Sequence, residues 1–448
     1  MNSDSQLNRW RRRATSYLAL FALACGAAQV HAAEPSWKTV ETLTTEERAL
    51  FDPSTSKPRD PTLSYVPAEP WPFKAPYTAE EMGYRSSDFL HIAHWQSSLV
   101  DVYGVITSSG YINQGVSVGY ITQTTAPGLD GYIRGLKAGD VYARWMLFNT
   151  FPPEIEAQQQ LWVIYRTDQK FATKMDFFVY SPQLRRVRRQ PQPRRDQRFP
   201  DNAQTFDDVV GRDPWELDWS LLGTDTLHES VRYPNTRPTI TLNEGGKGFV
   251  EHKTADIKPM GDDYPFYTAD GNVDCWVLKA RIRDDFLPGY NEKTLIVWVD
   301  KHYFFPLRIE KYDHQDELIM IEVHNAKLEN AARKEFGYAS HTSVYWDLPH
   351  DFLSYSLHDG HTVHQWTPEE QAMLFTPEFM RREWLYEPLK SQALIREPDH
   401  YFMRPLVYDG KFPSERKIVM SPELAARVQA QESAGHLVFE SAGAPATR

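Results

Sequence analysis

A long stretch of period-two patterning constrains this chain more than any other feature. Between about residues 100 and 345, apolar and polar residues alternate in short runs separated by turn residues, as in Leu307-Arg308-Ile309-Glu310. The connections are short, for example Ser181-Pro182 and Asp313-His314-Gln315-Asp316. Because short connections join antiparallel neighbours, the pattern predicts a large antiparallel sheet and excludes a doubly wound parallel one.

The predicted strands share β-branched and aromatic residues and are bounded by turn residues. They cover residues 115–124, 159–167, 174–180, 183–189, 217–226, 273–283, 294–300, 304–312 and 317–327. Aromatic residues make up 13% of the chain, which favours strands with large buried surfaces. Cys275 lies in one of these runs, and we expect it to be a small buried apolar residue.

The regions on either side of the predicted β domain, residues 78–346, differ from it. Residues 33–77 are rich in proline and predict an extended segment, interrupted by a short helix at the capping box of Thr44 and Glu47. A second box, Thr78 with Glu81, predicts a helix that runs toward Leu99. From residue 347 to 448, Thr-Pro-Glu and Ser-Pro-Glu starts predict short helices and loops that wrap the sheet within the same globule.

The N-terminus has the layout of a secretory signal. Four arginines between residues 9 and 13 precede an apolar run over residues 17–28, and Val30-His31-Ala32 places small residues at a cleavage site. We therefore expect residues 1–32 to be a signal peptide and the protein to be periplasmic. The residues before Cys25 do not fit a lipoprotein signal, so lipidation is not expected. The net charge of −11 argues against a nucleic-acid partner.

Catalytic motifs give little support to an enzyme. The sequence has no Gly-x-Ser-x-Gly elbow, no His-Glu-x-x-His and no glycine-rich phosphate loop. His358, His361 and His364 lie close together, but Asp359-Gly360 indicates a turn between them, and a zinc site would need a further ligand. We expect no cofactor, no metal and no catalytic residue. A periplasmic, metal-dependent hydrolase that uses these histidines is the alternative.

An arginine cluster supports a different alternative. Seven arginines fall within residues 185–198 of an otherwise acidic chain. They can be the solvated charges of an edge strand, which prevent aggregation. They can also contact anionic lipid headgroups or an acidic partner, in which case Arg185, Arg186, Arg188 and Arg189 are the candidates. A structural envelope protein that docks a partner through this segment is therefore a third possible function.

Two segments resemble a known group of proteins. The run over residues 297–313, continuing to Asp316-Glu317-Leu318, resembles the central hairpin of the LolA/LolB-like outer-membrane lipoprotein-sorting proteins, in which a strand ending in Asp precedes a Pro-Leu-Arg strand. Residues 178–189 resemble another of their hairpins. The segment Asp213-Pro214-Trp215 with Asp218-Trp219 is similar to a longer branch of exported proteins with a domain of unknown function. The resemblance covers roughly residues 160–330.

The resemblance implies a half-open β-barrel, which is an antiparallel sheet curled around helices with an apolar concave face. The expected class is mainly β (α+β). The expected function is a periplasmic carrier for a lipid, lipoprotein acyl chains or a sterol-like molecule, acting beside a membrane exporter or at the outer-membrane surface. Aromatic and apolar residues of the strands are the candidate lining of the ligand cavity. They are Trp162, Phe177, Trp276, Trp298, Phe304 and Leu307.

Overall fold

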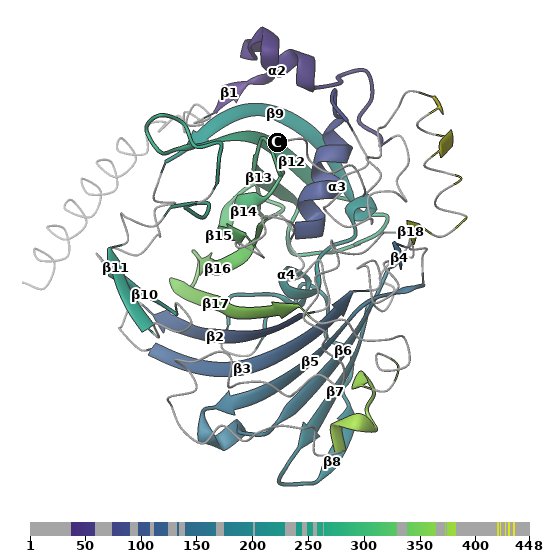
Figure 1. The fold of residues 1–448 in the computed structure, drawn as a ribbon, viewed down its shortest axis with the longest axis vertical. Helices are drawn as coiled ribbons and strands as arrows, with labels where there is room; N and C mark the ends of the chain where they lie inside the picture. Colours follow the sequence, from purple (N-terminus) through teal and green to yellow (C-terminus); the bar gives the residue numbers. More distant parts are fainter. Residues whose placement is uncertain are drawn as a thin grey trace, which may run out of the picture. The chain divides into compact units, whose positions relative to one another are not determined.

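The computed structural model describes the greater part of the chain and divides it into two units, residues 1–38 and 39–448. Figure 1 shows the helices and strands of the chain. The predicted signal peptide lies outside the described residues. These are residues 37–58, 74–89, 97–107, 112–123, 132–133, 139–166, 174–199, 202–228, 239–243, 249–253, 258–262, 264–328, 338–363, 374–381 and 419–420, together with a few isolated positions.

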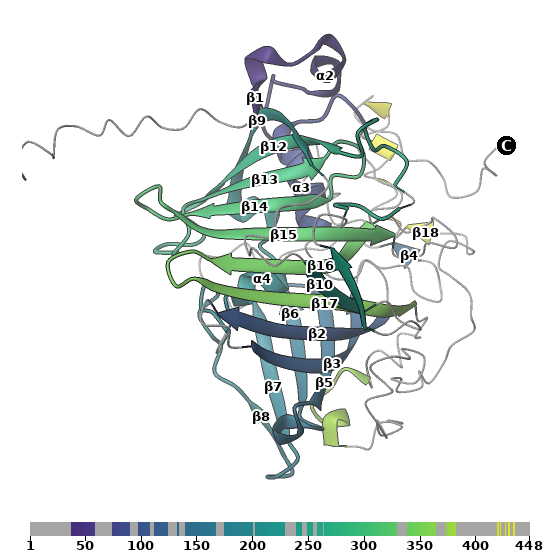
Figure 2. The same ribbon diagram turned by 90° about the vertical axis from the view of Figure 1, so that its left-hand side faces the viewer.

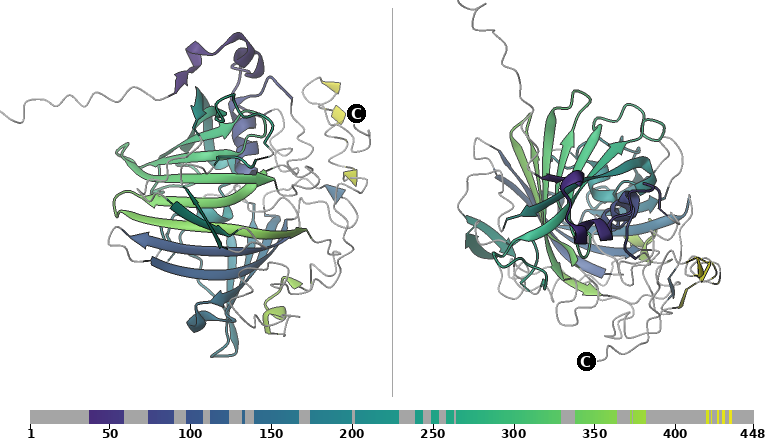
Figure 3. Two further views of the ribbon diagram at one scale, coloured as in Figure 1. Left: turned by 60° about the vertical axis from the view of Figure 1, so that its left-hand side comes forward. Right: turned by 90° about the horizontal axis from the view of Figure 1, so that it is seen from above.

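One 14-stranded sheet dominates the fold. The pairings from β9 to β8 are all antiparallel, and the first and last strands are not paired with each other, so the curved sheet stays open (Figures 2 and 3). Its order is β1 (Lys38–Thr39), β9 (Leu217–Leu227), β12 (Val273–Ile282), β13 (Thr294–Asp300), β14 (Pro306–Tyr312), β15 (Leu318–Leu328), β16 (Tyr338–Asp347), β17 (Phe352–Val363), β2 (Ser97–Thr107), β3 (Ile112–Gln123), β5 (Val141–Phe151), β6 (Gln159–Tyr165), β7 (Met175–Ser181) and β8 (Arg186–Arg189). The predicted half-open antiparallel sheet with covering helices is confirmed.

The remaining elements are short. Two further sheets pair β10 (Thr239–Asn243) with β11 (Phe249–Lys253), and β4 (Tyr132–Ile133) with β18 (Val419–Met420). The helices are η1 (Val40–Thr42), α2 (Thr45–Leu50), α3 (Ala79–Phe89), η3 (Pro153–Ile155), α4 (Phe206–Val210), η4 (Pro214–Glu216) and η7 (Phe379–Arg381). Both predicted capping boxes are present, because the side chains of Thr44 and Thr78 each accept a hydrogen bond from the backbone N–H three residues later.

Helix α3 packs inside the curve of the sheet (Figure 1). Its buried residue Met82 joins a core with Trp219 of β9, Trp276 of β12 and Val297 of β13. Gly83 allows the close approach, because a Cβ built on it would lie only 2.2 Å from the Trp219 indole. The first strands of the sheet are therefore closed on their inner side by this helix.

The hairpin that resembles the lipoprotein-sorting proteins is organised by one carboxylate. Asp300 ends β13 and accepts hydrogen bonds from three backbone N–H groups of the following turn, at 2.7 to 3.1 Å, and from the Tyr264 hydroxyl at 3.1 Å. Phe304 adopts a φ of 62° in this turn and packs its ring edge-on against Tyr77. Burial raises the pKa of Asp300, against the effect of these hydrogen bonds. The aspartate at the end of the strand is thus the acceptor that shapes the turn.

Several predicted boundaries are wrong. The predicted helix does not reach Leu99, which lies in β2; the described helix is Ala79–Phe89.

Strands β5 and β16 were not expected, because β5 is apolar on both faces and β16 is rich in small polar residues. β17 was expected to be loop, and Asp359-Gly360 is not a hairpin turn. The ladder between β17 and β2 shifts register there, so the pair forms a bulge within a strand.

Candidate functional site

The inner face of the sheet is the candidate site, and the strand register defines which residues belong to it. Cross-strand partners point to the same side of a sheet. Following the partners from Val297 through Ile309, Glu322 and Tyr345 leads across β17, β2 and β3 to Trp145 on β5 and Trp162 on β6. One continuous inner face therefore runs from the α3 core to β7.

The six predicted lining residues fall into separate groups on the sheet. Trp276 and Phe304 belong to the α3 core, and Leu307 is fully buried two residues before Ile309 on the same face. Trp298 pairs with Val277 and so lies on the opposite face, where its indole N–H donates to Asp225 at 2.9 Å. The structure does not bring all six around one space. Their contact with a ligand stays a prediction.

Trp162 and Phe177 belong to what we call the aromatic cluster, formed by Trp145, Trp162, Phe177, Phe199 and Phe206. The Trp162 ring is nearly parallel to Trp145, with ring centroids 5.8 Å apart, and nearly parallel to Phe199 at 5.6 Å. Phe177 meets Trp162 edge-on, and Phe206 lies 4.0 Å from Phe199 between ring centroids. The strands provide one side of this cluster and an irregular segment provides the other.

That irregular segment, residues 194–199 and 202–216, is called the cover segment here. It contains α4 and η4, and α4 begins with a capping box in which Thr205 accepts from the Asp208 N–H and donates its own N–H to the Asp208 carboxylate. Figure 1 shows α4 inside the curve of the sheet. The segment lies between the strands that pack against α3 and the strands β5 to β7. Its aromatic side chains contact β5 to β7, and two of its charged side chains contact residues on or just before β13 and β14.

Its first charged anchor is Arg195, which is buried. The guanidinium contacts both carboxylate oxygens of Asp207, at 2.9 and 3.0 Å, and both of Glu216, at 2.6 Å each. Glu216 also lies 3.7 Å from the ammonium of Lys174, and Asp213 lies 3.2 Å from it. Arg166 donates to Asp213 at 2.7 Å. This end of the cover segment is therefore tied to the residues that flank β6 and β7.

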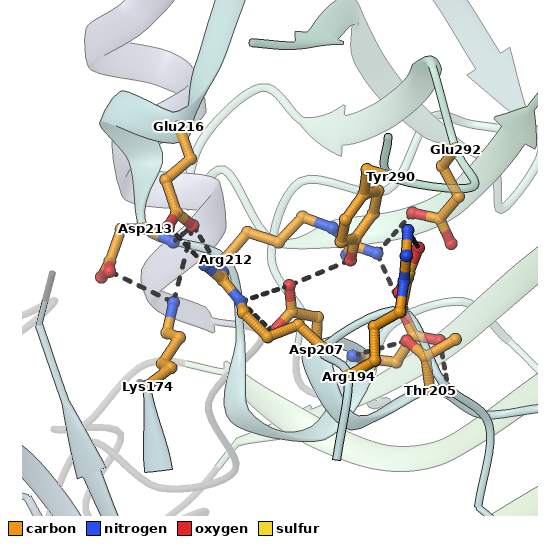
Figure 4. A network of polar contacts seen from close by, with 12 residues as sticks. Lys174, Arg194, Thr205, Asp207, Arg212, Asp213, Glu216, Tyr290 and Glu292 are labelled. Carbon is orange, nitrogen blue, oxygen red and sulfur yellow. Dashed lines mark hydrogen bonds and ion pairs between the residues drawn. The ribbon is translucent and has the colours of Figure 1, made fainter. Parts of the chain in front are cut away.

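A second set of ion pairs ties the cover segment to the strands β13 to β15. Lys311, on the inner face of β14, contacts Asp208 of α4 and lies 3.1 Å from Glu322 of β15. Arg212 contacts Glu292, just before β13, and the hydroxyl of Tyr290 donates to Asp207 at 2.9 Å (Figure 4). All of these charged side chains are buried, so each depends on its partners for its ionised state.

The pKa values of this network reflect the pairing. Burial alone would raise the pKa of Asp208, but the Lys311 ammonium and the Arg212 guanidinium outweigh it and hold the pKa at about 2. The pKa of Lys311 is raised, because its carboxylate partners overcome the effect of burial. Burial raises the pKa of Glu292 and lowers that of Lys174, in both cases against their charged neighbours. The network thus holds Asp208 and Lys311 as a fixed ion pair.

Sequence reasoning missed this network, although one signal was present. In Leu307-Arg308-Ile309-Glu310-Lys311 the alternation places Lys311 on the same face as Leu307 and Ile309, which is the buried face. A lysine at an inward position predicts a buried carboxylate partner. The partner itself, Asp208, lies 103 positions earlier in the chain, so the sequence alone does not identify it.

The arginine cluster separates into two parts. Arg195 is buried in the network, and Arg198 pairs with Asp347. The four candidate contact residues Arg185, Arg186, Arg188 and Arg189 are exposed on the hairpin of β7 and β8, and β8 is an edge of the sheet. Arg189 pairs with Asp176. Leu184, at the tip of this hairpin, is 52% exposed. The exposed part of the cluster is therefore a charged edge beside an exposed leucine.

The histidine alternative falls largely outside what the structure determines. His358 and His361 are residues of β17, and His364 lies outside the described residues. Within the described part of the chain, no three histidine, cysteine or carboxylate residues are grouped as metal ligands would be.

Among the described residues, none of the helices has the length and apolar character needed to cross a membrane. Cys275 is fully buried, and burial raises the pKa of its thiol.

Solved structures with some similarity include three bacterial proteins. An outer-membrane lipoprotein-sorting protein domain from Vibrio parahaemolyticus is 12% identical, with 68% of this chain and 98% of that chain covered and a TM-score of 0.45. A DUF1329 family protein from Desulfovibrio piger is 14% identical, with 66% and 95% covered and a TM-score of 0.44. A LolA superfamily protein from Nitrosomonas europaea is 12% identical, with 68% and 99% covered and a TM-score of 0.39.

The family comparison covers most of the chain. The sequence matches none of the curated proteins with which it was compared. The model of a family described as a protein of unknown function, DUF1329, matches residues 27–381, which include every strand of the large sheet and the whole cover segment. The chain therefore belongs to the DUF1329 family.

Proposed function

We propose that this protein binds a hydrophobic or amphipathic molecule on the inner face of its sheet and carries it through the periplasm. The ligand would lie between the strand side of the aromatic cluster, Trp145, Trp162 and Phe177, and the cover side, Phe199 and Phe206. The periplasmic location is inferred from the signal-like N-terminus. The carrier class is the one that the resemblance to lipoprotein-sorting proteins implies.

The observation that carries the proposal is the sorting of contacts along the cover segment. Near Phe199 and Phe206, it meets β5 to β7 through aromatic rings. Its charged contacts at Asp208 and Arg212 run instead to Lys311 and Glu292. The apolar contact can therefore part while these ion pairs persist, and the C-terminal end of the segment, at Asp213 and Glu216, remains tied to Lys174.

The energetics are consistent with exchange of one apolar contact for another. When the rings part, each Å² of aromatic surface that becomes exposed to water costs about 25 cal/mol of free energy. A hydrophobic ligand that takes the place of Phe199 buries this surface again and recovers that free energy. Breaking the ion pairs would instead leave buried charges without partners, at about 3–5 kcal/mol for each pair. The seam between the aromatic rings is thus the place where the fold opens most easily toward a ligand.

The direct test is to identify what the protein carries. The full chain would be produced with its own N-terminus, purified from periplasm without detergent, extracted with organic solvent and analysed by mass spectrometry. A stoichiometric lipid or other hydrophobic compound supports the proposal. A protein that yields no such compound, and that also fails to take up a fluorescent fatty acid or a neutral fluorescent lipid, contradicts it.

We further propose that the exposed arginines of the β7–β8 hairpin contact an anionic lipid surface. The specific observation is the combination at one edge of four exposed arginines with a leucine that is 52% exposed, in a chain of net charge −11. Basic side chains at an anionic surface contribute about 1 kcal/mol each. Leu184 would add a small apolar contact beside them. This contact would bring the carrier to the membrane that supplies or receives its ligand.

A further inference from the structure

The indole N–H of Trp145 is a buried hydrogen-bond donor, and the described residues offer it no acceptor. Its side chain is 2% exposed, and its indole Nε1 has no hydrogen-bond partner in the described part of the chain. Three other tryptophans show the usual arrangement, since their indole N–H groups donate to Gln160 (from Trp162), to the Pro214 carbonyl (from Trp219) and to Asp225 (from Trp298), at 2.9 to 3.2 Å. A buried donor without an acceptor is rare in proteins, and a bound molecule that offers an acceptor would account for it.

The neighbours of Trp145 on the inner face change from apolar to polar along β5. Leu147 and Asn149 follow Trp145 on the same face, and their partners on β3 are Gly119 and Ser117. Asn149 and Ser117 are 4% and 3% exposed, and the Asn149 amide donates to the Gln158 side chain at 3.0 Å. Gly119 has no side chain, so it takes up no space opposite Leu147. A ligand along this face would therefore meet aromatic rings first and neutral polar groups next.

The charge of this region is also informative. None of these five positions of β3 and β5 carries an ionisable side chain. Two buried cationic groups of the network, Lys174 after the aromatic strand β6 and Arg166 at its end, pair with Asp213. A carboxylate or phosphate placed at Trp145 would lose its hydration without gaining a charged partner, which is strongly unfavourable. An uncharged oxygen would lose far less and would gain the indole N–H.

We propose that the ligand is an uncharged amphiphile, and that the Trp145 indole N–H donates a hydrogen bond to an ester carbonyl or hydroxyl oxygen of it. The hydrocarbon part lies along Trp162 and Phe177, in the place that Phe199 occupies in this structure. The proposal rests on the proposed carrier function and adds to it the class of ligand and the residue that recognises its polar group. It predicts a preference for acyl esters and alcohols over fatty acids in their ionised form.

The test compares two probes of equal chain length, a monoacylglycerol and an n-alkane, by displacement of a bound fluorescent lipid from the full chain. Trp145→Phe keeps an aromatic ring and removes the N–H, so it should weaken monoacylglycerol binding about tenfold and leave alkane binding unchanged. The matched control is Trp162→Phe, because the Trp162 N–H is already bonded to Gln160. It should weaken both probes by the same factor.

Each outcome decides a different point. If the wild-type protein binds neither probe, the carrier function itself fails. If it binds both and Trp145→Phe changes both equally, the hydrogen-bond proposal is overturned and the carrier function stands. Tighter binding of an ionised fatty acid than of the monoacylglycerol overturns the uncharged class. Should Trp145→Phe disturb the fold, benzothienylalanine at position 145 keeps the shape of the ring system without the N–H, and the same probe difference is expected.

Discussion

Arg195 donates two parallel hydrogen bonds to Glu216, each 2.6 Å long, and both side chains are buried. The two residues lie at opposite ends of the cover segment, so the pair closes the segment into a loop. Bidentate geometry of this kind is specific to the planar guanidinium, and a lysine cannot reproduce it. The loop therefore keeps its shape independently of the aromatic rings that it places over Trp162.

Replacement of Arg195 should destabilise the fold strongly. Arg195→Met leaves Glu216 and Asp207 buried without their main cation, which should lower the free energy of unfolding by about 3–5 kcal/mol. Urea unfolding followed by tryptophan fluorescence measures the change. The control is Arg186→Met on the exposed edge strand, which should change the value by less than about 0.5 kcal/mol. Equal unfolding midpoints for the two variants would show that the network is not a structural anchor.

Acid should weaken the attachment of α4. The pKa of Asp208 is held at about 2, below its ordinary value of 3.8. A carboxyl group with a lowered pKa in the folded state stabilises the protein above the unfolded pKa, and this contribution is lost as the pH falls. The loss therefore begins below about pH 4, is complete only below about pH 2, and amounts to about 2 kcal/mol. Asp208→Asn should be less stable than wild type at pH 6, and the difference should shrink by pH 3. A constant difference contradicts the assignment.

Gly83 should tolerate no side chain. Gly→Ala in the middle of a helix ordinarily stabilises a protein by about 0.5–1 kcal/mol. In α3 the new methyl group would lie 2.2 Å from the Trp219 ring, so Gly83→Ala should destabilise by about 1–3 kcal/mol instead. Thermal unfolding measures the sign. The double variant with Trp219→Leu makes room for the methyl group. Its loss of unfolding free energy should therefore be smaller than the sum of the losses in the two single variants. A raised Tm for Gly83→Ala would exclude the tight packing.

The arginine hairpin should bind anionic vesicles. Replacing Arg185, Arg186, Arg188 and Arg189 by alanine removes about 1 kcal/mol of attraction for each residue that reaches the surface. Co-sedimentation with vesicles containing phosphatidylglycerol should therefore fall at least tenfold, and binding by the wild type should weaken as salt is added. Vesicles of phosphatidylcholine alone serve as the control. Equal sedimentation of wild type and variant with anionic vesicles would leave the arginines with the role of protecting an edge strand.

The sheet could be predicted because the residues that determine its strands and turns lie close together in the sequence. Alternation along the chain determines which side chains share a face, and Asp313-His314-Gln315-Asp316 is sufficient for a turn, as the structure confirms. β17 was missed for a local reason as well. Asp359-Gly360 is a strong turn signal in isolation, but pairing with β2 on one side and β16 on the other keeps it in the ladder as a bulge. Tertiary pairing overrode the dipeptide preference.

The candidate site was predictable only in part, because it depends on contacts between distant segments. Trp162 and Phe177 were expected to be inward aromatic residues, and the structure places them side by side. Their cover, Phe199 and Phe206, comes from a segment without alternation, and nothing in its spacing indicates where it packs. Trp298 was expected among the lining residues, but it lies on the opposite face of the sheet. Alternation could not decide its face, since every residue of its strand is buried.

Phe199 provides the last test, because it separates a removable cover from a permanent core. Phe199 is only partly buried, yet its ring lies nearly parallel to Trp162, with 5.6 Å between ring centroids. Phe199→Ala should leave the ion pairs of Arg195 and Lys311 in place, so the unfolding midpoint should fall only modestly. Removal of the ring opens one side of Trp162.

The association rate of a fluorescent lipid, measured by stopped flow as quenching of tryptophan fluorescence, should therefore rise several-fold in Phe199→Ala. Phe266→Ala is the matched control, because Phe266 is 42% exposed and stacks on His302 outside the aromatic cluster. It should leave the rate unchanged. If Phe199→Ala slows association or unfolds the protein, the ring belongs to the core, and a ligand would have to enter elsewhere. If the rate rises while the equilibrium affinity changes little, the contact of Phe199 with Trp162 is the step that limits entry.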